Sequence, residues 1–172
     1  SLGPRGLTLS TGAGKAAAES YVRLHQSLGL ETTILRMFSV YGPGQNLANK
    51  MQGMVSIFLS YLLERAPVTV KGSRDRFRDL IFIDDVVDAW TAALESPATS
   101  GRTYNLAGSR PVRIACILAY FRRRSRMPLR VESTAKRRGA DRLTGSAARI
   151  RRELGWSPRI SLERTLDDVL AE

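Results

Sequence analysis

The sequence has few of the residues that bind metals or form disulfides. Its 172 residues include one cysteine, Cys116, and one histidine, His25. A single cysteine excludes an intrachain disulfide and fits a reducing cytoplasm, and the two residues together cannot supply a zinc site. We therefore expect no metal. We expect Cys116, in the apolar run Ile114–Leu118, to be a buried small side chain, and His25 to be a partly solvated helix residue.

Long hydrophobic runs and a glycine-rich nucleotide loop are also missing. No uncharged run approaches the length that spans a bilayer, and no signal peptide is recognisable, so no membrane association is expected. No Gly-x-x-Gly-x-x-Gly follows a predicted strand, so the chain offers no site for the pyrophosphate of a dinucleotide cofactor. With 43% hydrophobic and 25% charged residues, the composition is typical of a globular protein, and residues 1–172 suffice for a single domain.

Acidic residues are scarce in the second part of the chain. Residues 1–100 contain 10 basic and 9 acidic residues, and residues 101–172 contain 17 and 7, so almost all of the net charge of +11 lies in the second part. Three interpretations remain open: an arginine-rich solvated surface, a site for a diphosphate, or a wider face for nucleic acid.

Helical and strand patterns alternate along the chain. We expect residues 1–10 to be irregular, with a short strand at 7–9. Hydrophobic periodicity, turn residues and capping residues predict helices over 13–28, 51–64, 84–96, 112–124, 146–154 and 161–170, and strands over 32–38, 68–71, 80–83, 103–106 and 129–132. Gly29 suits the end of the first helix, and Asp84 is expected to cap the third. This order predicts an α/β or mixed α+β fold.

Four segments together resemble a known family. They are Thr11–Lys15, Leu35–Gln45, Arg78–Val87 and Glu153–Pro158. Their order and spacing resemble the C-terminal half of the extended short-chain dehydrogenase/reductases, the NAD-dependent sugar-nucleotide epimerases and dehydratases of the UDP-glucose 4-epimerase type. The resemblance implies that residues 1–48 are the remnant of a Rossmann-like parallel sheet with its catalytic helix. It implies that residues 49–172 are the smaller sugar-nucleotide-binding part.

The resemblance also places the catalytic segment of the family. The family pattern is Tyr-x-x-x-Lys at the start of a helix, in which the lysine binds ribose and lowers the tyrosine pKa. Here Lys15 is present, but Thr11 stands at the tyrosine position. A threonine hydroxyl is too short and too weakly acidic for that role, so we expect Thr11 to be a helix N-cap and Lys15 a surface residue. The resemblance gives two vestigial cofactor contacts, Lys15 and Ser39. Ser39 lies on the strand that runs beneath the nicotinamide in the family.

The nucleotide-binding positions of the family are better preserved. The resemblance places Asn49, Lys50 and Met51 at a helix N-terminus that faces the diphosphate. Lys71 stands where the family carries an aromatic residue against the base, so that stacking face is lost. Arg78 matches the arginine that contacts the diphosphate, although it could instead be a strand-edge arginine paired with Asp75 or Asp79.

A last contact segment is implied at residues 136–141. Arg138 and Asp141 are the residues closest to a family pattern in which arginine holds phosphate and the acid holds ribose hydroxyls. A solvated basic loop is the alternative for this segment.

Three functions follow from these observations, and whether the chain is an enzyme stays open. The first is a truncated or degenerate epimerase/dehydratase relative, without oxidoreductase activity alone, that still binds a nucleoside diphosphate sugar. The second is one half of a two-chain epimerase. The third is a basic module that binds nucleic acid or an acidic protein.

The predicted first helix and the strand after it favour self-association. The strand over 32–38 would lack neighbours, and Ala16, Ala17, Tyr21 and Leu24 form a small, apolar helix row. We therefore expect a homodimer.

Overall fold

The structure, a computed structural model, describes residues 4–50, 53–70, 72–108, 110–124, 130–133, 142–162 and 164. Its elements are α1 (Pro4–Ser27), β1 (Thr33–Met37), β2 (Ser39–Tyr41), α2 (Met54–Leu63), β3 (Val68–Val70), β4 (Phe77–Phe82), α3 (Ile83–Glu95), the 3₁₀ turn η1 (Pro97–Thr99), β5 (Arg102–Leu106), β6 (Pro111–Arg113), α4 (Ile114–Arg124), β7 (Val131–Ser133), β8 (Arg142–Leu143) and α5 (Ala148–Leu154).

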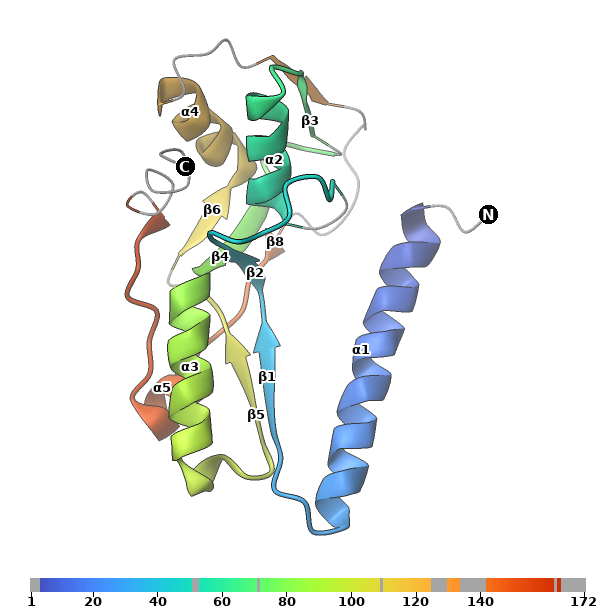
Figure 1. Cartoon of the computed structure of the whole chain (residues 1–172), viewed down its shortest axis with the longest axis vertical. Coiled ribbons are helices and arrows are strands. Elements are labelled where there is room, and N and C mark those ends of the chain that lie inside the picture. The colour runs from blue at the N-terminus through green and yellow to red at the C-terminus, as the bar shows by residue number, and fades with distance from the viewer. Residues whose placement is uncertain are drawn as a thin grey trace.

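The strands form three small groups in which parallel pairing predominates. β1 pairs with β5, β2 with β4, β3 with β7 and β8 with β4, all in parallel, while β6 runs antiparallel to β4. In Figure 1, α3 runs alongside β1 and β5, and α2 and α4 lie at the other end of the molecule, around β4 and β6. The mixed α/β class predicted from the sequence is confirmed.

Two hydrophobic clusters lie beneath these helices. One joins α2 and α4 to β2, β3 and β4, with Phe58 and Phe121 among its buried members. The other joins β5, α3 and α5, with Tyr104 and Trp156 among its members. Among the described residues, no helix is both long and apolar enough to cross a membrane.

Helix α1 is longer than its sequence pattern predicts. It begins at Pro4, so the irregular segment and short strand expected before residue 13 are wrong. Thr11 lies inside the helix and is not its N-cap. Proline is favoured in the first turn of a helix, and no second proline follows to stop α1.

The end of α1 matches the prediction. The N–H of Gly29, which has φ +95°, donates to the Gln26 carbonyl, and the N–H of Leu30 donates to the His25 carbonyl. These two bonds form a Schellman motif, in which glycine adopts the left-handed conformation without strain.

Other helix starts differ from the predictions. α2 begins at Met54 and not at residue 51. Phe82 is the N-cap of α3, so Asp84 lies in the first turn and does not cap it, although a carboxylate there still suits the helix dipole. Pro111 belongs to β6, and α4 begins only at Ile114. α5 begins at Ala148.

Cys116 is exposed, so its predicted burial is wrong. The buried residues of α4 recur at helical spacing as Ile114, Ile117, Leu118 and Phe121, which leaves position 116 on the outer face. His25 is exposed on α1, as expected.

Candidate functional site

A cavity of about 410 Å³ opens between α2, β3, β4 and the start of α4. One wall is a single stripe of α2, formed by Met54, Ile57, Phe58 and Tyr61. These positions follow the i, i+3, i+4, i+7 spacing that brings side chains to one helix face. Gly53, Thr69, Val70 and Ile114 complete the described lining that is not basic. The volume is within the range of small-molecule sites.

Three basic residues line the same cavity. They are Lys50, Arg76 and Arg78, and none of the described lining residues is a carboxylate. The Nη1 of Arg78 donates to the carbonyl of Phe77 at 2.7 Å, and the Nε of Arg76 donates to the carbonyl of Ser73 at 2.9 Å. Gly53 and Met54, at the N-terminus of α2, also border the cavity. A helix N-terminus and fixed guanidinium groups both favour an anion.

Lys50 contacts the C-terminal end of this α2 wall. Lys50 precedes α2 in sequence, yet its Nζ lies 2.5 Å from Oε2 of Glu64, the C-cap of α2. The same Nζ lies 4.8 Å from the centre of the Tyr61 ring, in the last turn of α2. The hydrogen bond from Lys50 lowers the pKa of Glu64. The Lys50 and Glu64 side chains are 37% and 48% exposed, so the ion pair is a weak constraint.

Asp79, the neighbour of Arg78, holds a different strand in place. Its side chain is 1% exposed, and its Oδ2 accepts a hydrogen bond from the N–H of Gly145 at 3.0 Å. Burial raises the pKa of Asp79, while the N–H groups of Gly145 and Gly108 partly oppose the rise. Because Gly145 follows β8 and β8 pairs with Phe77 and Arg78, the carboxylate secures β8 beside the arginine. A Cβ at Gly108 would lie 2.0 Å from the Leu80 carbonyl oxygen, so only glycine fits there.

The remaining sequence motifs have structural roles. Asp85 is buried, and its carboxylate accepts hydrogen bonds from the N–H groups of Arg159 and Ile160. Its carbonyl accepts the indole N–H of Trp156 at 3.1 Å. The Tyr104 hydroxyl donates to Glu153 at 2.9 Å, and that hydrogen bond lowers the pKa of Glu153. These contacts join the Arg78–Val87 and Glu153–Pro158 segments to the core.

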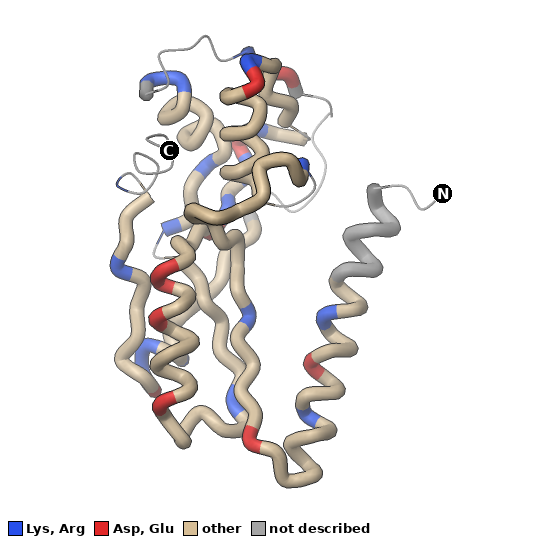
Figure 2. Tube along the Cα trace, in the orientation of Figure 1, with Lys and Arg blue, Asp and Glu red and all other residues tan. Residues whose placement is uncertain are grey.

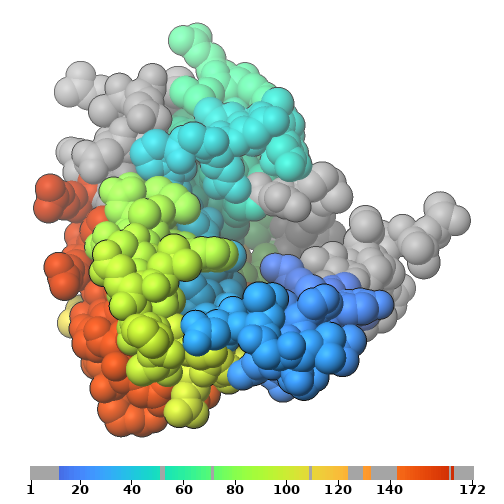
Figure 3. Space-filling view, turned by 60° about the horizontal axis from the view of Figure 1, so that its bottom comes forward, coloured from blue at the N-terminus to red at the C-terminus, as the bar shows by residue number. Residues whose placement is uncertain are grey.

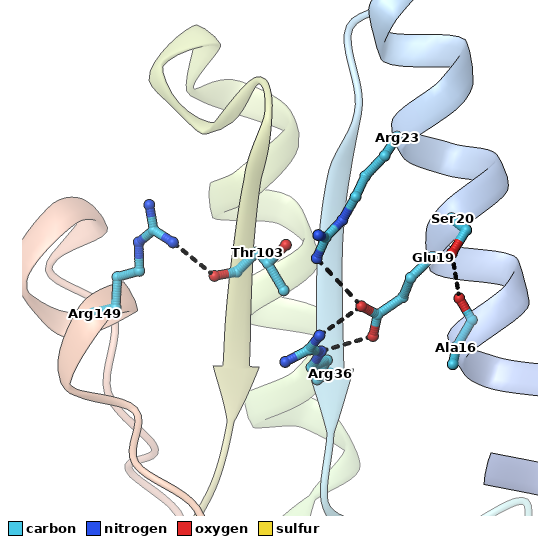
Figure 4. A network of polar contacts seen from close by, with 7 residues as sticks. All are labelled: Ala16, Glu19, Ser20, Arg23, Arg36, Thr103 and Arg149. Carbon is cyan, nitrogen blue, oxygen red and sulfur yellow. Dashed lines mark hydrogen bonds and ion pairs between the residues drawn. The ribbon is translucent and has the colours of Figure 1, made fainter. Parts of the chain in front are cut away.

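The Thr11–Lys15 segment lies on α1, which stands apart from the body of the molecule (Figure 1). An ion pair links α1 to β1: Arg36 donates to both carboxylate oxygens of Glu19 at 2.6 Å, and Arg23 lies 3.5 Å from the same carboxylate (Figure 4). The hydrogen bond from Arg36 lowers the pKa of Glu19. Lys15 is exposed on α1, and Ser39 lies in β2 opposite Leu80. Neither is among the residues that line the cavity.

The structure brings together only part of the predicted site. Arg78 and Lys50 line the cavity. Asn49 is exposed in the preceding loop, where its N–H donates to the Asn46 carbonyl. The predicted residues Met51, Lys71, Arg138 and Asp141 lie outside the described part of the chain.

Arg76 and Tyr61 are among the cavity residues that sequence reasoning missed. Arg76 lies two residues before Arg78, a spacing that brings side chains to one side of an extended chain. Tyr61 lies seven residues after Met54, so helical periodicity could have placed it on the same wall. Among the described residues, no group of three or more His, Cys, Asp or Glu side chains could hold a metal ion.

The fold and cavity define an α/β protein with a site suited to an anionic small molecule. Residues 12–107 match the NAD dependent epimerase/dehydratase family, and the chain belongs to that family. It is 31% identical over 165 residues to dTDP-L-rhamnose 4-epimerase of Burkholderia thailandensis, an alignment that covers 92% of this chain and 44% of that protein.

Solved structures of similar proteins have the same fold. The UDP-glucose 4-epimerase of Thermotoga maritima, solved with UDP-glucose, is 26% identical with a TM-score of 0.83. The match covers 93% of this chain and 52% of the epimerase chain. The UDP-glucuronic acid 4-epimerase of Bacillus cereus, solved with UDP-glucuronic acid and NAD, is 25% identical with a TM-score of 0.82. This match covers 99% of the present chain and 53% of the epimerase chain. The chain thus spans about half the length of these relatives.

Proposed function

We propose that the cavity between α2 and β4 binds a nucleoside diphosphate sugar through its diphosphate. The observation that carries this proposal is the set of three cations, Lys50, Arg76 and Arg78, around a cavity whose described lining contains no carboxylate. The similarity to proteins solved with UDP-glucose and UDP-glucuronic acid supports UDP as the probe. Arg138 and Asp141 remain proposed contacts from the segment before β8.

Among the arginines, we expect Arg78 to contribute most to binding of the diphosphate. Its backbone is fixed in β4 between β6 and β8, so its fork is better ordered for a diphosphate than a side chain on a loop. We expect Arg78→Ala to weaken UDP binding by about 1.5–3 kcal/mol, the range for hydrogen bonds to charged groups. Arg78→Lys keeps the charge but loses the fork, so we expect it to bind with intermediate affinity.

Calorimetric titration with UDP at fixed salt measures these effects. Arg151→Ala is the control, because Arg151 is an exposed arginine on α5 and its loss changes the net charge equally. Equal affinities for Arg78→Ala and wild type, or no saturable binding by wild type, would contradict the proposal.

We further propose that residues 1–172 alone have no oxidoreductase activity. Thr11 replaces the tyrosine of the family pattern, and a threonine hydroxyl cannot act as the general base of that pattern. The protein freed of UDP, mixed with UDP-glucose and NAD, should produce no NADH absorbance or fluorescence and no epimerised sugar. Turnover under these conditions would overturn this part of the proposal.

Self-association is the proposed assembly. Ala17, Tyr21 and Leu24 on α1, with Leu28 one residue beyond its end, form an exposed stripe. The less exposed Glu19, Val22 and Gln26 lie on the opposite side of the helix, toward β1. Because the apolar stripe faces away from the body of its own chain, we propose that α1 packs against α1 of a second copy in a two-fold dimer.

A further inference from the structure

The aromatic surface of the cavity comes from α2. Tyr61 is the aromatic residue of the described lining besides Phe58, which is 4% exposed and belongs to the core. Tyr61 is partly buried, packs against that core, and still reaches the cavity. It therefore has a fixed ring with one part anchored and another part accessible to a ligand.

The Tyr61 ring already attracts a positively charged group. The Lys50 ammonium lies over it at 4.8 Å from the ring centre, within the range of a cation–π contact. Lys50 and Tyr61 both line the cavity, so this contact lies at the cavity wall. Because the Lys50 and Glu64 side chains are partly exposed, a planar ligand can displace Lys50 from the ring at little cost.

The length of α2 fits a ligand with an anionic end and an aromatic end. Seven residues separate Met54, at the N-terminus of α2, from Tyr61, and seven residues rise about 10.5 Å along a helix. The helix N-terminus favours the diphosphate. A planar base stacks on an aromatic ring, and such contacts are sequence-tolerant and favourable.

We propose that Tyr61 is the base-stacking residue of this cavity and so takes the place of the aromatic strand residue that the sequence lacks at Lys71. The inference rests on the proposed nucleotide-binding function and names the residue that determines affinity for the base. Lys50 acts with it: it covers the ring in the free protein and leaves the ring when the base binds.

The test compares UDP with inorganic diphosphate, which has no base. Tyr61→Leu removes the ring and keeps an apolar side chain, and Tyr61→Phe keeps the ring. We expect Tyr61→Leu to raise the Kd for UDP about fivefold to tenfold, with the Kd for diphosphate unchanged. Tyr61→Phe should bind both as wild type does. Tyr120→Leu is the matched control. Tyr120 on α4 also has a cation, Arg123, over its ring but is not among the cavity-lining residues.

A second readout does not depend on the leucine variant being folded. Bound to wild type or Tyr61→Phe, the uracil H5 and H6 resonances of UDP should shift upfield through the ring current of residue 61. Absence of that shift, or equal loss of UDP and diphosphate binding in Tyr61→Leu, would overturn the inference for Tyr61. If wild type binds UDP and Tyr61→Leu binds it equally well, only this inference fails. If wild type does not bind UDP, the proposed function itself fails.

Discussion

Asp79 shows how a buried carboxylate can organise a site without lining it. Its carboxylate accepts the N–H of Gly145 and secures β8 beside Arg78. The sequence offered Asp79 only as one alternative partner of Arg78 and did not reveal its contact with the segment after β8. Asp79 forms its contact with a glycine 66 residues away in the chain, and no local pattern carries that information.

The raised pKa of Asp79 predicts a pH dependence of stability. A carboxyl whose pKa is higher in the folded than in the unfolded state stabilises the fold when protonated, and this contribution is lost as pH rises through the folded pKa. We therefore expect wild type to gain stability relative to Asp79→Asn as pH falls from 7 toward and through that pKa. Urea unfolding of both proteins at several pH values measures the difference in their unfolding free energies. Glu19, Glu64 and Glu153, whose pKa values are lowered, are present in both proteins, so their contributions cancel in this difference.

Asp88→Asn, at an exposed position of α3, is the control for removing one carboxylate. The quantity to follow is the unfolding free energy of wild type minus that of Asp79→Asn. A difference that stays constant with pH, or that falls on acidification, would contradict the account of Asp79.

At the scale of the elements, α1 leaves large apolar side chains exposed. Tyr21, Leu24 and Leu28 are 66%, 52% and 74% exposed, and Figure 3 shows α1 in blue at the surface of the molecule. Local patterns predicted the core of this helix and its Gly29 ending, because both depend on neighbours along the chain. Its start at Pro4 and its exposure were not predictable in that way, since helical spacing alone does not say what covers an apolar face.

The exposed stripe of α1 gives a prediction about assembly. Leu24→Glu places a charge in the centre of the proposed contact, so it should convert the dimer to a monomer at tens of micromolar (an order-of-magnitude choice). Light scattering coupled to size-exclusion chromatography measures the mass. Ala18→Glu adds the same charge at an exposed α1 position off the stripe and should leave the dimer intact. A monomeric wild type, or equal dissociation by both variants, would contradict the dimer.

At the scale of the whole molecule, charge and shape separate two kinds of ligand. Acidic residues gather along α3, whereas basic residues are distributed over several elements (Figure 2). The cavity combines three cations with a helix N-terminus. A compact site of this kind suits a diphosphate, while nucleic acid requires a wider basic face.

The sequence predicted the family and the mixed fold, because family motifs are local and ordered along the chain. Arg78 lines the cavity, and its contact with a diphosphate stays a prediction. The sequence could not predict the cavity wall, because Tyr61, Arg76 and Ile114 meet only after α2, β4 and α4 pack together.

The most direct test of nucleotide binding is to map the amides that UDP perturbs in the two-dimensional NMR spectrum of the 19.0 kDa chain. The account predicts saturable shifts at Gly53, Tyr61, Arg76 and Arg78, which line the cavity, and none on the exposed face of α5. Salt should weaken the binding without moving its location. No shifts up to about 1 mM UDP, a concentration that would detect even a weak site, would contradict the account. Shifts confined to the arginines of α5, with stronger perturbation by DNA than by UDP, would contradict it as well.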